Sequence, residues 1–144
     1  MKSGGLDLGS LRAAVASLEG ALSVVDDKEW LAAQSDKVRD TLGAGVVQNF
    51  EFVYEVAVKI LRRRLVLDAA TPADVVALNF RDLLRHAGDA GLVDEIEAWF
   101  QFREMRNLTA HAYDRAKAAM IQAAAPSLAR HARALLERLE ANNG

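Results

Sequence analysis

Residues 46–61 have the sequence VVQNFEFVYEVAVKIL, and this stretch decides the fold. Its apolar side chains recur at spacings of three and four, which places them on one face of an α-helix. The positions on this face are Val47, Phe50, Tyr54, Ala57, Leu61 and Leu65. The pattern predicts a helix from about residue 36 to residue 65, long enough to cross a whole domain at about 1.5 Å per residue. Gly43 and Gly45 are expected to weaken its first half.

Four other segments show helical patterns. A stripe from Leu8 to Val25 predicts a helix that ends near residue 26. Thr71-Pro72-Ala73-Asp74 predicts the start of a helix that runs to about residue 86. Residues 93–108 predict another, and Asp114 is expected to cap a last helix, about 115–142, that Pro126 kinks or splits. We therefore expect one domain, 1–144, that is all-α: an antiparallel four- to five-helix up-and-down bundle.

Composition narrows the classes of function. The chain is 51% hydrophobic, with 9 Gly, 2 Pro and no Cys, which favours helices and excludes disulfides and thiolate metal sites. The net charge of −2 argues against a broadly basic nucleic-acid binder, so any RNA contact is expected to be local. The sequence shows no secretion signal, membrane span, cofactor motif or metal-ligand spacing around its histidines. These features predict a cytoplasmic protein without metal or cofactor.

The residues with the clearest chemistry lie in RNLTAHAY, residues 106–113. On a continuous helix Arg106 and His111 would lie roughly 140° apart, whereas His111 and Tyr113 would share one side of an extended segment. We therefore expect a helix end after Arg106 and an extended stretch from Ala110 to Tyr113, with all three side chains at one cleft. A His for proton transfer and an Arg for phosphate suit RNA cleavage through the ribose 2′-OH, with Asn107 in a supporting role.

A purely structural role is the alternative for each of the three main residues. Arg106 could be a cation at a helix C-terminus, His111 a loop residue bonded to backbone, and Tyr113 a residue at the edge of the core. Arg81 and His86 have the same spacing without the other motif residues, so spacing alone is weak evidence.

Two charged clusters also allow either a structural or a functional interpretation. Glu51 and Glu55 form either a solvated helix face, in which Lys59 pairs with Glu55, or a site in which Glu51 helps to orient Arg106 or a partner. The triplet of residues 62–64, Arg-Arg-Arg, favours a structural role near a helix C-terminus, with contact to RNA or a partner as the alternative.

The segment RNLTAHAY resembles the R-x4-H-x-Y signature of the HEPN superfamily. Residues 46–61 and AWFQFREMRNLTAHAYD, residues 98–114, resemble the second-helix and fourth-helix blocks of its nucleotidyltransferase substrate-binding subunits, which include the HepT-like toxins. TPADVV, residues 71–76, also fits, so the resemblance covers about residues 8–139.

This resemblance implies an up-and-down helical bundle that forms a homodimer and works with a separately encoded minimal nucleotidyltransferase. It also implies an RNase toxin in which Arg106 and His111 cleave RNA, and in which AMP transferred to Tyr113 by the partner neutralises the toxin. The alternative is a non-catalytic subunit that presents substrate to the nucleotidyltransferase. A helical adaptor with no site is disfavoured by the motif.

Overall fold

The computed structural model describes residues 5–143, so residues 1–4 and Gly144 of the expected domain lie outside it. The described helices are α1 (Gly9–Asp26), α2 (Lys28–Ala32), α3 (Asp36–Asp68), α4 (Pro72–Val76), α5 (Phe80–Asp89), α6 (Ile96–Leu108) and α7 (Arg115–Ala141), with one 3-10 turn, η1 (Thr109–His111). Residues 5–143 contain no strand, so the all-α prediction is confirmed. None of these helices is long and apolar enough to cross a membrane.

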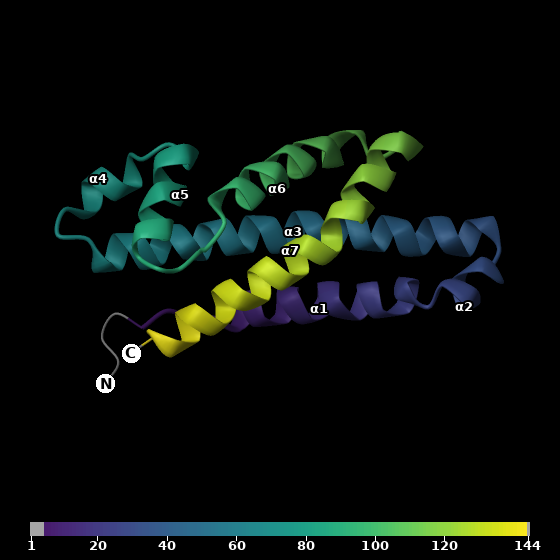
Figure 1. Cartoon of the computed structure of the whole chain (residues 1–144), viewed down its shortest axis with the longest axis horizontal. Coiled ribbons are helices and arrows are strands. Elements are labelled where there is room, and N and C mark those ends of the chain that lie inside the picture. Colours follow the sequence, from purple (N-terminus) through teal and green to yellow (C-terminus); the bar gives the residue numbers. More distant parts are fainter. Residues whose placement is uncertain (1–4, 144) are drawn as a thin grey trace.

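Helix α3 is the axis of the molecule (Figure 1). Its 33 residues extend about 50 Å, and α1 runs antiparallel beside it. Helix α6 returns along α3, and α7 crosses α3 and α1 obliquely. The four long helices thus alternate in direction, as an up-and-down bundle requires. Leu6 and Asn143 meet at one end of the bundle, where the Asn143 side chain bonds the backbone N–H and carbonyl of Leu6 at 2.7 and 2.9 Å.

The core lies where the apolar faces of the four long helices meet. Leu11 and Leu18 of α1, Phe50 of α3 and Trp99 of α6 are all fully or almost fully buried in one cluster. All six positions of the stripe predicted for α3 are buried, which confirms it. The helix also continues through Gly43, where a Cβ would lie 2.7 Å from the Gln122 side chain of α7. Gly43 therefore leaves room for the Gln122 side chain of α7 and does not interrupt α3.

The predicted third helix, from residue 71 to about residue 86, is wrong. The structure has two helices there, α4 and α5, separated by residues 77–79. Asn79 is extended, at φ −70° and ψ 171°, and its side chain accepts a hydrogen bond from the Asp82 N–H at 2.9 Å. That bond satisfies an N–H group that a helix start leaves unpaired, so a new helix begins at Phe80.

Pro126 does not split the last helix, which runs unbroken as α7. Pro126 is exposed, whereas Ile121, Ala125 and Leu128 beside it are fully buried. A proline on the solvent side leaves a carbonyl that water can satisfy, and the buried face holds the helix together across it.

Asp114 is predicted to stabilise α7. Its side chain accepts hydrogen bonds from the N–H groups of Ala116 and Lys117 at 2.9 and 3.2 Å. Asp114→Ala should lower the free energy of unfolding by about 1 kcal/mol and the melting temperature by about 2–4 °C. Asp114→Asn should retain most of the stability because it can also cap the helix. Calorimetry that found the Ala variant as stable as the parent would show that this cap contributes nothing.

Candidate active site at the junction of α6 and α7

The motif residues lie where α6 ends and α7 begins, and the backbone between them is not extended. The expected extended stretch from Ala110 to Tyr113 is wrong, since Thr109–His111 forms η1 and Ala112 has φ −69° and ψ −8°. The turn satisfies its own polar groups: the Ala112 N–H donates to the Thr109 carbonyl at 3.3 Å, and the Asp114 N–H donates to the His111 carbonyl at 3.0 Å. This local bonding makes a compact connection possible.

The turn nevertheless brings His111 and Tyr113 together. The His111 Nδ1 atom lies 3.4 Å from the Tyr113 hydroxyl oxygen, a long contact, and the ring centroids are 6.0 Å apart. Both side chains are exposed, Tyr113 to 84%. The imidazole and the phenol are therefore both accessible to a molecule that approaches this end of α6.

Arg106 is held by Glu55 of α3. Its Nε and Nη2 atoms donate to one carboxylate oxygen of Glu55, at 3.1 and 2.7 Å. The pKa of Arg106 is raised, chiefly by this hydrogen bond and further by the charges of Glu55 and Glu51, while partial burial opposes the rise. The side chains of Arg106 and Glu55 are 40% and 47% exposed, so the pair is solvated and exchangeable. Arg106, rather than Lys59, is the cation that forms an ion pair with Glu55.

Glu51 holds the end of α6 rather than the guanidinium of Arg106. Its carboxylate lies 2.9 Å from the Thr109 hydroxyl, which also lies 2.6 Å from the carbonyl oxygen of Arg106. The single hydroxyl proton is thus shared between the two acceptors. Asn107 is exposed on α6, and its side chain makes no hydrogen bond within residues 5–143.

Sequence reasoning missed Glu55 and Thr109 as parts of this site. The sequence did contain a signal for Glu55. Two carboxylates four residues apart on a helix repel each other unless a cation or a hydrogen-bond donor lies beside them. The spacing could not show which carboxylate faces Arg106, since that depends on how α6 lies against α3.

Tyr54 lies one residue before Glu55 and is 7% exposed. Burial raises the pKa of Tyr54 to about 12, although the positive charges of Arg103 and Arg106 act in the opposite direction. Its hydroxyl therefore stays protonated near neutral pH, and Tyr54 belongs to the support of the site rather than to its titrating groups.

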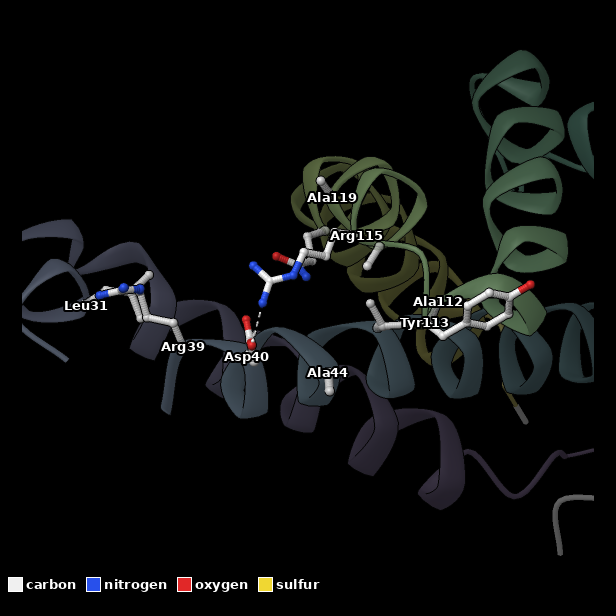
Figure 2. Close-up of a pocket in the computed structure, with 11 residues that line it drawn as sticks. Leu31, Arg39, Asp40, Ala44, Ala112, Tyr113, Arg115 and Ala119 are labelled. Carbon is white, nitrogen blue, oxygen red and sulfur yellow. Dashed lines mark hydrogen bonds and ion pairs between the residues drawn. The ribbon is translucent and has the colours of Figure 1, made fainter. Parts of the chain in front are cut away.

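A cavity of about 520 Å³ opens beside this site, between α3 and the start of α7 (Figure 2). Tyr113 lies at its edge with the hydroxyl directed away from it. Arg115 and Asp40, which line the cavity, form an ion pair at 3.0 Å. Arg106 and His111 do not line it, so the candidate site is an open surface and not this cavity.

No cluster of three or more His, Cys, Asp or Glu side chains able to hold a metal ion occurs in the part of the chain that the structure describes. His86 and His131 lie on α5 and α7, outside the motif segment. The ring of His131 packs 5.5 Å from that of Phe102, a core residue.

Comparison with known proteins gives consistent matches over almost the whole chain. A family model described as "Nucleotidyltransferase substrate binding protein like" matches residues 6–141. A Haemophilus influenzae protein named "Probable ribonuclease HepT" is 40% identical over 138 residues, which are 96% of this chain and 94% of that protein. A solved structure from Haemophilus influenzae, described as a substrate-binding domain of a nucleotidyltransferase, has a TM-score of 0.90 and 40% identity, covering 93% of this chain and 99% of that one.

The Arg106–Glu55 pair predicts competition between Glu55 and anions. Glu55→Gln should strengthen binding of inorganic phosphate about two- to fivefold, because it removes a competing charge whose exposed ion pair contributes less than about 1 kcal/mol. Glu51→Gln is the matched control and should change phosphate binding little. Titration calorimetry on both variants and on Arg106→Gln gives the answer. The role assigned to Glu55 fails if the two glutamate variants bind phosphate equally well.

Proposed function

The chain belongs to the family of nucleotidyltransferase substrate-binding-like proteins, and we propose that within it this chain is a metal-independent endoribonuclease, the toxin of a two-gene toxin–antitoxin module. The observation that carries the proposal is the exposed pair of His111 and Tyr113 at the α6–α7 junction, with Arg106 and its solvated ion pair in the last turn of α6. It occurs in a chain that is 40% identical, over nearly its full length, to a protein named as a ribonuclease.

The proposed reaction uses the ribose 2′-OH of RNA as the nucleophile. His111 accepts the 2′-OH proton, a bond forms between the 2′ oxygen and phosphorus, and the bond from phosphorus to the 5′ oxygen breaks. The leaving oxygen takes a proton from water or from the imidazolium of a second copy. Arg106 turns from Glu55 to the phosphate and stabilises the charge that develops on its oxygens. Asn107 is a supporting residue whose side chain can hydrogen-bond either the ribose 2′-OH or the phosphate.

We expect the working form to be a homodimer with two copies of Arg106 and His111 in one cleft. A single copy offers only an open surface to a phosphate. Two copies facing each other would enclose the scissile phosphate and supply both a proton acceptor and a proton donor.

Tyr113 is the proposed point of control by a minimal nucleotidyltransferase partner. Its hydroxyl oxygen would attack the α-phosphorus of ATP, pyrophosphate would leave, and His111 or water would take the phenolic proton. The 84% exposure of Tyr113 and its contact with His111 support this role. The attached AMP would place a negative phosphodiester beside the residues that bind RNA phosphate, so inhibition needs no change of fold.

The second candidate is a non-catalytic subunit that presents substrate to a nucleotidyltransferase. The solved relative described as a substrate-binding domain of a nucleotidyltransferase favours it.

The RNase proposal predicts cleavage of single-stranded RNA by the purified chain in the presence of a metal chelator. His111→Ala and Arg106→Ala should each lower the rate at least about a hundredfold, the usual loss for a missing acid–base or charge-stabilising group. Arg81→Ala and His86→Ala are matched controls, because they have the same spacing on α5. Gel assays, with light scattering on the same samples, test activity and dimer together. Full activity in the His111 variant would contradict the proposal.

The proposed control predicts that a cognate nucleotidyltransferase with ATP adds AMP to Tyr113. Intact-mass measurement should show the addition, and peptide mapping should place it on Tyr113. Tyr113→Phe should keep RNase activity and escape inhibition, whereas Tyr54→Phe, which changes the buried tyrosine, should still be modified. Modification and silencing of the Tyr113→Phe variant would assign the acceptor to another residue.

A further inference from the structure

A second surface lies along the C-terminal half of α3, beyond the candidate site. It is a groove of about 560 Å³ with an aliphatic floor formed by Leu6, Val58, Val66, Leu67 and Val76. Leu67 and Val76 are 50% and 62% exposed, which is high for aliphatic side chains that lie together.

The floor of this groove is held in place by hydrogen bonds. Arg62 donates to the carbonyl oxygens of Val75 and Leu78 at 3.2 and 3.0 Å, which ties α4 and the segment after it to α3. At the other side, Asn143 fixes the backbone of Leu6. The groove is therefore formed before anything binds to it.

The three arginines at residues 62–64 have different environments. Arg62 bonds backbone carbonyls, and Arg64 is 6% exposed and paired with Asp68 at 2.7 Å. Arg63 is exposed on the groove, as is Lys59 one turn earlier. No carboxylate of residues 5–143 lies within ion-pair distance of Lys59 or Arg63, and no acidic residue lines the groove. The groove therefore presents two cations without a carboxylate partner beside an aliphatic floor.

We propose that this groove docks a short acidic and aliphatic segment of a protein partner. Carboxylates of the segment would pair with Lys59 and Arg63 while its apolar side chains cover Val58, Leu67 and Val76. The proposal goes beyond the RNase function and does not depend on it.

Charge and chemistry favour this occupant over three others. A second copy docked symmetrically by the same groove would bring its own Lys59 and Arg63 against these cations. Residues 1–4, next to Leu6 in the chain, contain Lys2 and no carboxylate. RNA would satisfy the cations, but the groove is lined by aliphatic side chains and has no aromatic ring on which a base could stack.

The test is selection of short peptides from a displayed random library on the purified full chain. Enriched peptides should combine two or more carboxylates with aliphatic residues.

Lys59→Gln combined with Arg63→Gln should weaken their binding about tenfold in fluorescence anisotropy, since two exposed ion pairs are lost. Lys37→Gln combined with Arg130→Gln is the matched control, because it removes one exposed Lys and one exposed Arg elsewhere, and it should leave binding unchanged. Circular dichroism checks that both variants are folded.

Three results would overturn the proposal. The first is enrichment of peptides without carboxylates, and the second is equal binding of acidic peptides to the groove variant and the control variant. The third is failure of acidic peptides to enrich while the same groove variant loses binding of a non-cleavable single-stranded 2′-deoxy oligonucleotide, which would assign the groove to nucleic acid. RNase activity is not measured in any of these arms, so the result is independent of the proposed catalytic function.

Discussion

Packing of the apolar stripe of α3 is the constraint on which the rest of the structure depends. Helix α3 contacts α1, α4, α5, α6, α7 and η1, and its face from Val47 to Leu65 is buried against them. The same helix carries Glu51 and Glu55 on the side that meets the end of α6. Because one rigid helix bears both the core and these carboxylates, the packing of the core also sets where Arg106 and Thr109 are held.

The Arg106–Glu55 pair is suited to a site that must exchange partners. An exposed ion pair contributes at most about 1 kcal/mol, so Glu55 can keep the guanidinium extended without a large cost when an anion replaces it. A phosphate carries more oxygen acceptors than one carboxylate and can bond the planar guanidinium at two points. The bond between Glu51 and Thr109 holds the end of α6 separately from this ion pair.

The exposed surface of α3 divides into two chemically distinct regions that adjoin at Glu55 and Lys59. The first, around Glu55 and the end of α6, is polar and carries the ion pair of Arg106 with Glu55. The second, from Lys59 to Leu67, is aliphatic with a cationic rim. Because Lys59 follows Glu55 by one helical turn, a segment bound in the second region would lie beside the first. The two surfaces could then be occupied together or compete, depending on the length of the segment.

Periodicity in the sequence was enough to predict the all-α fold, α1, α3 and the buried stripe of α3. Apolar residues at spacings of three and four share one face only on an α-helix. The motif with its resemblance selected Arg106, His111 and Tyr113 as candidate site residues, and that selection stays a prediction. The break at Asn79, the compact turn of Thr109–His111 and the choice of Glu55 over Glu51 were decided only in the tertiary structure. At Asn79 and at the turn, local hydrogen bonds compete with continuation of the helix, and spacing alone does not say which of the two forms. The pairing of Arg106 with Glu55 depends on how α6 packs against α3, and sequence spacing does not contain that distance. The same holds for residues 62–64, where three identical side chains differ only in what surrounds them.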